Sequence, residues 1–213
     1  GWGGFWFWDP VENASLLPWF AMTALMHSII LLEKKKVLYN WVIFLCLLTF
    51  SLSVMGTFLV RSGILNSVHT FASDPARGIY ILTFLIAMVL VSLLVLLKKT
   101  KEEKIYESSS KLTFILINNW FMMFFLVTVL IGTIYPIFSE VLINTKISVG
   151  PPYYNSILIP IIIPFLFLMA LGPKFKIYGK LKNQFKNIFV ILFFSILINF
   201  LILKLLDKPT MLT

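Results

Sequence analysis

Residues Tyr39–Val60 read YNWVIFLCLLTFSLSVMGTFLV and contain no charged side chain. A helix needs roughly 20 apolar residues to cross a hydrocarbon core of ~30 Å, so this stretch predicts a transmembrane span. The rest of the chain has the same character, since 59% of its 213 residues are hydrophobic and 13% are charged. Soluble domains are about a quarter charged. The composition therefore predicts a multi-pass membrane protein.

Six stretches are long and apolar enough to span a membrane. They are Ala14–Leu32, Tyr39–Val60, Tyr80–Leu97, Asn119–Phe138, Ser156–Leu171 and Ile188–Leu206. The predicted fold class is all-α, a polytopic transmembrane helical bundle with about six spans, and Asn13 or Ser15 is expected to cap the first. Residues 1–213 then form a single membrane domain with four parts. These are a Trp-rich segment at 1–13, two spans over 14–60, a loop with a histidine at 61–79, and four further spans over 80–206.

Basic residues predict the orientation of the spans. Thirteen of the 18 lysines and arginines lie in the links after the first, third and fifth spans. Basic loops stay in the cytoplasm, so the Trp-rich segment and the 61–79 loop are expected on the outer face. The net charge of +9 is then a topology signal and an attraction to anionic lipid, and it gives no support for nucleic-acid binding. Cys46 is the sole cysteine, so the chain holds no CxxC motif.

The segment Gly1–Ser15 reads GWGGFWFWDPVENAS and concentrates aromatic rings just before the first span. Its glycines let the backbone approach a flat partner, and its rings offer a large rigid apolar surface. We expect an aromatic shelf for a planar ligand at the membrane surface. Asp9 and Glu12 lie where a turn passes into a helix, and structural roles at that helix start explain both carboxylates.

The chain has two histidines, His27 and His69. His27 lies within the first span, ~21 Å along the helix from Asn13, where an ionisable side chain favours a functional role. Neutral imidazole is a ligand of haem iron. The alternative is a structural hydrogen bond, through Thr23 or Ser28. His69 lies in the outer loop, where it is either a ligand held near the aromatic shelf or a solvated side chain.

Arg61 and Arg77 bracket the same loop. They are interpreted as interface anchors, with recognition of ligand carboxylates as the alternative.

Four stretches resemble one known family. The opening GWGGFWFWDPVENASLLPW is similar to the tryptophan-rich "WWD" signature of haem-handling proteins, and its WDPVENAS continuation resembles the cytochrome c maturation F (CcmF) branch. The stretches ALMHS (24–28), GTFLVRSGILNSVHTFASDPARG (56–78) and ISVGPPYYN (147–155) resemble the same branch. The resemblance covers nearly the whole chain and is strongest over residues 1–80.

The resemblance implies a cytochrome c haem lyase, which joins haem vinyl groups to the CxxCH thiols of apocytochrome c. It implies that a haem in transit is held at the outer face and that a haem b is held in the membrane. The residues implied for the transit haem are Trp2, Gly3, Gly4, Trp6, Trp8, Asp9 and His69, with His69 on the iron, and the residue implied for haem b iron is His27. Placement of the reactants, rather than acid or base chemistry, is the contribution expected of the protein.

The resemblance also implies partners and a location. The partners are a haem chaperone (CcmE-like), apocytochrome c and a CcmH-like thiol-redox subunit. The location is the bacterial inner membrane with the WWD segment on the periplasmic side, and a mitochondrial inner membrane stays open. The second ligand of each haem is expected before Gly1 and after Thr213, so the chain alone is expected to be an inactive fragment.

Two other classes of protein remain as alternatives. One is a transmembrane haem transporter or exporter without ligase activity, for which an iron ligand deep in the bilayer, such as His27, has no evident use. The other is a structural subunit whose aromatics form an interfacial belt. Four of the six tryptophans fall within residues 1–19, which argues against a belt spread over both interfaces.

Overall fold

The computed structural model describes residues 5–64, 67, 74–99, 110–145, 147–174 and 197. These residues form five α-helices and one short 3-10 turn: α1 (Pro10–Lys35), α2 (Tyr39–Ser62), α3 (Pro75–Lys99), α4 (Ser110–Ile143), α5 (Pro151–Leu171) and η1 (Gly172–Lys174). All five helices are long and apolar enough to cross a membrane. The all-α class and the first five spans are therefore confirmed. The sixth expected span, Ile188–Leu206, lies outside the described residues except for Leu197.

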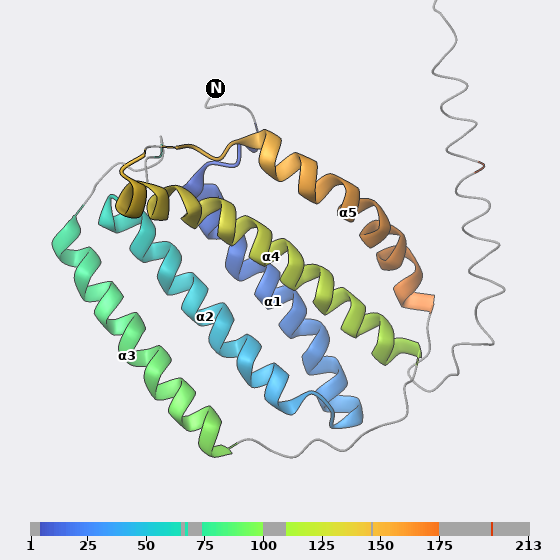
Figure 1. Cartoon of the computed structure of the whole chain (residues 1–213). Coiled ribbons are helices and arrows are strands. Elements are labelled where there is room, and N and C mark those ends of the chain that lie inside the picture. The colour runs from blue at the N-terminus through green and yellow to red at the C-terminus, as the bar shows by residue number, and fades with distance from the viewer. Residues whose placement is uncertain are drawn as a thin grey trace, which may run out of the picture.

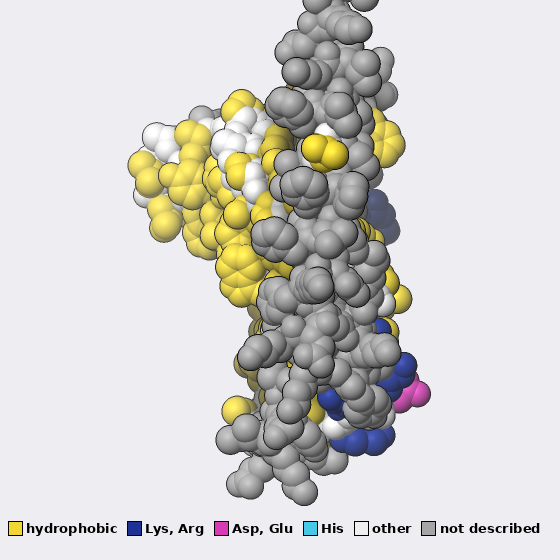
Figure 2. Space-filling view, turned by 90° about the vertical axis from the view of Figure 1, so that its right-hand side faces the viewer, with side chains coloured by type: hydrophobic (Ala, Val, Ile, Leu, Met, Phe, Trp, Pro, Cys, Tyr) yellow, Lys and Arg dark blue, Asp and Glu magenta, His cyan; other side chains and the backbone are white. Residues whose placement is uncertain are grey.

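The helices lie side by side in the order α3, α2, α1, α4, α5, so that the first helix of the chain is in the middle (Figure 1). Successive helices run in opposite directions. The end of the bundle where α1 starts is here named the tryptophan end, and the end where α1 finishes at Lys34 and Lys35 is named the lysine end. Most of the visible lysine and arginine side chains gather near the lower, lysine end in Figure 2. This asymmetry is the one that the basic links predict.

The core of the bundle forms where α1 packs between α2 and α4. Leu17, Ala24, Leu45, Met122 and Val129 are almost completely buried in one hydrophobic cluster that joins these helices. Small residues let the helices approach closely, which is the usual way to gain packing energy in a membrane. The central position of α1 means that a side chain at either of its ends can contact α4 and its neighbours.

The expectation that Asn13 or Ser15 caps the first helix is wrong. The helix begins at Pro10 and its N-cap is Asp9, whose carboxylate accepts a hydrogen bond from the Val11 N–H at 2.9 Å. The Glu12 carboxylate reaches back to accept from the Asp9 N–H at 3.1 Å, which completes a capping box. The long apolar stretch begins at Ala14, whereas the capping carboxylates of Asp9 and Glu12 start the helix about one turn earlier.

Candidate functional site

Trp8 is the residue that ties the Trp-rich segment to the bundle. Its ring stacks on Tyr154 of α5, with the centroids 4.5 Å apart and the planes 10° from parallel. The Trp8 indole N–H donates to Asn155 Oδ1 at 3.2 Å. The backbone of Trp8 is in the left-handed region, with φ of 59°, which is uncommon for a residue other than glycine. Tertiary contacts therefore hold Trp8 in a conformation that it would rarely adopt alone.

Asn13 and Gly132 complete this support from two other helices. Asn13 of α1 is fully buried, and its Nδ2 donates to the Trp8 carbonyl at 3.1 Å and to the Tyr154 hydroxyl at 3.0 Å. Gly132 of α4 makes room for the tyrosine, because a Cβ there would lie 2.6 Å from the Tyr154 hydroxyl oxygen. Three helices thus fix the position of one tryptophan.

The two carboxylates of the segment have structural partners, as the sequence predicts. Glu12 accepts from the Phe7 N–H at 3.0 Å in addition to its part in the capping box. Asp9, the N-cap, also accepts from the Ser67 hydroxyl at 2.6 Å. This bond brings the loop between α2 and α3 against the Trp-rich segment.

Three aromatic rings of the segment remain at the surface. Phe5 is fully exposed, Phe7 is half exposed, and Trp6 is 37% exposed while it packs edge-on against Trp8 at 6.0 Å. Among the described rings, Trp6 is therefore the indole available to a ligand, and Trp8 is its support. Trp2, Gly3, Gly4 and His69 lie outside the described residues.

A cavity of about 300 Å³ lies beside this support at the tryptophan end. Its lining includes Pro10, Gly132, Glu140, Val149 and Tyr154. Space next to the aromatic segment is thus bordered by α1, α4, the start of α5 and the residues just before it.

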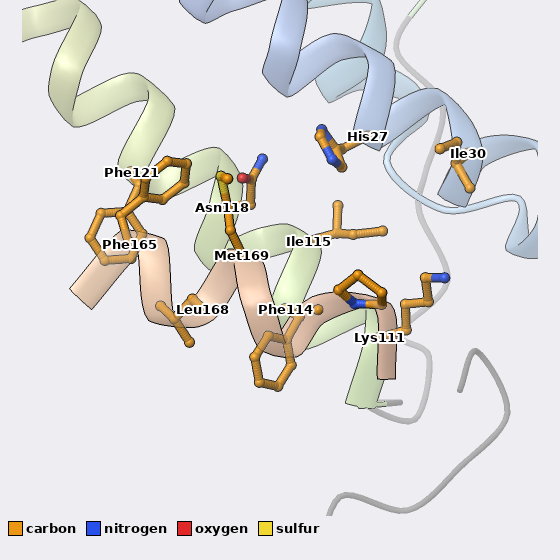
Figure 3. Close-up of a pocket in the computed structure, with 12 residues that line it drawn as sticks. His27, Ile30, Lys111, Phe114, Ile115, Asn118, Phe121, Phe165, Leu168 and Met169 are labelled. Carbon is orange, nitrogen blue, oxygen red and sulfur yellow. The ribbon is translucent and has the colours of Figure 1, made fainter. Parts of the chain in front are cut away.

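A second cavity, of about 370 Å³, lies between α1, α4 and α5 toward the lysine end, and it contains His27. Its remaining lining is mostly apolar: Ile30, Lys111, Phe114, Ile115, Asn118, Phe121, Phe165, Leu168, Met169, Gly172 and Pro173. In Figure 3 the His27 ring and the Asn118 side chain face one another across this space, with Met169 nearby. The volume falls within the range of ~300–1,000 Å³ that is usual for small-molecule sites.

The His27 ring uses only one of its nitrogens for structure. Nδ1 lies 2.8 Å from the Thr23 carbonyl oxygen. A carbonyl can only accept, so Nδ1 donates to it, and in the neutral imidazole Nε2 then keeps its lone pair. The hydrogen bond through Thr23 that was the structural alternative is present, and it is also the arrangement that fixes the tautomer and orientation of a metal-binding histidine. The two interpretations are therefore compatible.

A polar clamp holds α1 against its neighbours one residue beyond His27. Asn119 of α4 is buried and lies 2.7 Å from the Ser28 hydroxyl. When the Asn119 amide oxygen faces Ser28, it accepts from the Ser28 hydroxyl and from the Trp41 indole N–H at 3.1 Å. The amide nitrogen then donates to the Ala24 carbonyl at 3.2 Å. The clamp joins α1, α2 and α4, so it sets the wall of the cavity from which His27 projects.

The two arginines have local roles in the backbone around the loop. Arg77 forms an ion pair with Asp74 at 3.1 Å at the start of α3. The Arg61 carbonyl accepts from the Asp74 N–H at 2.8 Å. Nothing among the described residues directs either guanidinium into a cavity with His27.

Several residues of these sites were not identified from the sequence: Asn13, Lys111, Asn118, Tyr154 and Asn155. Asn13 and Asn118 could have been found, because an asparagine within or beside an apolar span needs a hydrogen-bond partner as much as a histidine does. Tyr154 and Asn155 lie in a stretch that was noted only for its resemblance. Their pairing with Trp8 over some 146 residues of sequence could not be read from local pattern.

Fold and sites together define a multi-pass helical membrane protein with an aromatic segment at one end and a histidine-containing cavity toward the other. The family model described as Cytochrome C assembly protein matches residues 1–65. The chain is 45% identical over 175 residues to the cytochrome c-type biogenesis protein CcmF of Pseudomonas aeruginosa, which covers 81% of this chain and 27% of that protein. It is 46% identical over 176 residues to the CycK protein of Bradyrhizobium diazoefficiens, with 81% and 27% covered.

A solved structure gives the same result. The structure of "Cytochrome c Heme Lyase CcmF" superposes with a TM-score of 0.62 at 25% identity, over 85% of this chain and 26% of that one. The chain belongs to the CcmF family of cytochrome c-type biogenesis proteins. It spans about a quarter of the length of these relatives.

Proposed function

We propose that this chain handles haem at two levels of the membrane during the covalent attachment of haem to apocytochrome c. The tryptophan end would hold a haem in transit, which is the substrate. The cavity that contains His27 would hold a resident haem b. The observation that carries the proposal is the Nε2 of His27, which has no hydrogen-bond partner among the described residues and lines a mostly apolar cavity.

The residues of the cavity fit a haem. The aromatic and aliphatic side chains of α4 and α5 suit an apolar macrocycle, and the Nδ1–H bond to Thr23 aims the imidazole. The Asn118 amide nitrogen is buried and has no hydrogen-bond partner in the described part of the chain, so the site keeps a polar group that a ligand can satisfy. When bound, haem b supplies an iron centre that can exchange an electron. The protein's own part would be to hold the iron through His27 and to exclude water.

At the tryptophan end, Trp6 would pack against the transit haem and Trp8 would support Trp6. The Ser67–Asp9 hydrogen bond connects the segment with the loop whose sequence continues to His69. We propose His69 as an iron ligand there, and Trp2, Gly3, Gly4 and Asp9 as further members of the haem-binding segment. Each side chain has the task of fixing orientation, so that haem vinyl groups and CxxCH thiols meet in a productive geometry.

Orientation and partners complete the proposal. The lysine end would face the cytoplasm and the tryptophan end the periplasmic side of a bacterial inner membrane, because basic segments flank the former. A CcmE-like haem chaperone, apocytochrome c and a CcmH-like thiol-redox subunit would meet the protein at the tryptophan end. A haem exporter is the competing function, and it would need no iron ligand in the His27 cavity.

Absorption spectroscopy of the protein purified in detergent tests the proposal. His27→Ala is expected to abolish the reduced-minus-oxidised signal of a b-type haem, and the smaller variant His27→Gly is expected to regain it when imidazole is added. The matched control is Met26→Ala, because Met26 is 62% exposed on the same helix and does not line the cavity. An unchanged haem b spectrum in His27→Ala would contradict the assignment.

The transit site has a separate readout. His69→Ala is expected to leave the haem b spectrum intact and to abolish holocytochrome c formation in cells. Normal holocytochrome c with His69→Ala would exclude that residue from the site. Haem export without any loss of ligation in either variant would favour the competing function.

A further inference from the structure

The His27 cavity holds a cation whose presence the proposed function does not explain. Lys111 lies in the first turn of α4 and lines the cavity. Its ammonium group forms no hydrogen bond or ion pair with any described residue. The first turn of α4 contains no acidic residue. A lysine is unfavourable at this position, because the N-terminus of a helix already carries partial positive charge. An anion in the cavity would reverse this penalty.

Resting on the proposed function above, we infer that Lys111 is the anion-binding group of the His27 cavity and pairs with the carboxylate edge of the haem bound there. Lys111 and Asn118 are seven residues apart, so they lie on the same face of α4 and are separated by ~10.5 Å along its axis. Asn118 is at the level of His27 in Figure 3, and Lys111 is displaced toward the lysine end. The metal-binding and anion-binding groups are therefore at different depths of one cavity.

The lining between these two depths is apolar. Phe114 and Ile115 lie between Lys111 and Asn118 on α4, and Leu168 and Met169 face them from α5. A ligand that fills this space must be apolar across its body, must offer a metal at one point, and must carry negative charge at one edge. These demands give haem one orientation, with its carboxylates toward the lysine end.

The inference also explains the lysine end of the cavity. Gly172 and Pro173 form that part of the wall with Lys111, and a Cβ at Gly172 would meet no atom within 4 Å. The cavity wall that contains Lys111 is therefore open beside Gly172. A charge-assisted hydrogen bond in such a partly enclosed place is stronger than one between neutral groups.

The test compares two ligands that differ only in charge at the edge. The protein is produced in haem-deficient cells, purified in detergent, and titrated with haem or with haem dimethyl ester while absorbance is recorded. The wild type is expected to bind haem roughly tenfold tighter than the ester, since a hydrogen bond to a charged group contributes about that factor. Lys111→Met is expected to lose most of this preference without changing the affinity for the ester. Lys111→Arg is expected to retain it.

Lys34→Met is the matched control, because Lys34 is an exposed cation at the same end of the bundle that does not line the cavity. It is expected to keep the full preference for haem. A full preference in Lys111→Met, or equal binding of haem and ester by the wild type, would overturn the inference. Equal binding is the result expected if the cation instead serves an anionic lipid headgroup. Unchanged haem binding by His27→Ala would overturn the proposed function itself, which is a different outcome from a failure at Lys111.

Discussion

The two ends of the bundle use the same three helices, α1, α4 and α5, in opposite ways. At the tryptophan end, Tyr154 is fully buried, stacks on Trp8, and has its hydroxyl bonded by Asn13, while Gly132 leaves no room for even a methyl group. At the His27 cavity, an imidazole nitrogen, an amide nitrogen and an ammonium group have no partner among the described residues.

This difference indicates that the tryptophan end supports a surface-exposed indole, whereas the His27 cavity is suited to receive a ligand. At the tryptophan end the hydrogen bonds of Asn13 and Asn155 hold one indole in place, while the buried Asn13 Oδ1 has no hydrogen-bond partner among the described residues. The exposed Trp6 packs against that fixed indole. The His27 cavity keeps its polar groups for something that is not part of the chain. A rigid support, as at the tryptophan end, lowers the free-energy cost of binding a ligand at a surface. Polar groups without partners, as in the His27 cavity, specify the chemistry of the ligand that can be buried there.

The largest difference in stability between the two ends is expected when one methyl group is added at each. Gly132→Ala would place a Cβ 2.6 Å from the Tyr154 hydroxyl and 2.7 Å from Tyr153 Cε1, and the tyrosine must move. We expect a loss of about 3 kcal/mol in the free energy of unfolding, at the upper end for overpacking. Thermal unfolding in detergent, with Trp fluorescence as a reporter of the Trp8 stack, measures it.

Gly172→Ala is the matched control for this variant. A Cβ at Gly172 meets nothing within 4 Å, so its stability is expected to stay within ~0.5 kcal/mol of the wild type or to rise slightly. Equal destabilisation by the two substitutions would show that the ends do not differ in packing.

Removing an amide at each end is expected to have a smaller effect. Asn13→Ala leaves the partly buried Trp8 carbonyl without its donor and removes one partner of the Tyr154 hydroxyl, at a cost of about 2 kcal/mol. Asn118→Leu removes an amide nitrogen that has no partner, so the stability of the haem-free protein is expected to be unchanged or higher. Chemical denaturation of both variants in one detergent checks the pair. A larger loss from Asn118→Leu would mean that the cavity amide is part of the fold.

The helix cap gives the smallest of the three effects. Asp9→Ala removes the acceptor for the Val11 N–H and for Ser67, and it is expected to cost about 1 kcal/mol. Asp9→Asn keeps an acceptor oxygen, and its free energy of unfolding is expected to fall by only a few tenths of a kcal/mol. The melting temperatures of the two variants compare them directly. If Asn and Ala were equally harmful, the negative charge of Asp9 rather than its hydrogen bonding would be the property that matters.

Prediction from sequence succeeded where a local pattern is sufficient. The spans follow from hydrophobic length, and α2 begins at the expected Tyr39. The structural roles of Asp9 and Glu12 follow from their position before an apolar run. The start of α1 was misplaced by about one turn, because the capping box of Asp9 and Glu12 lies upstream of the long apolar stretch that begins at Ala14.

The candidate sites were predictable only in part. His27 stands out because a histidine is rare within an apolar span, whereas nothing in the local sequence shows which of its nitrogens is free or that Lys111 lines the same cavity. Trp8 stands out by its composition, but its role as a support depends on Tyr154 and Asn155, which come from another helix.

Residue order alone identifies a helical membrane protein with an aromatic segment before its first span and a histidine within that span. Those properties depend on the length and polarity of continuous stretches, which the bilayer selects without regard to partners. The packing of the helices is needed to see that α1 lies at the centre and that Trp8 is packed while Trp6 is exposed. It is also needed to see that His27 shares a cavity with Asn118 and Lys111. Helices in a membrane choose their neighbours by close packing and by polar pairs between distant residues, and neither is encoded in the periodicity of one segment.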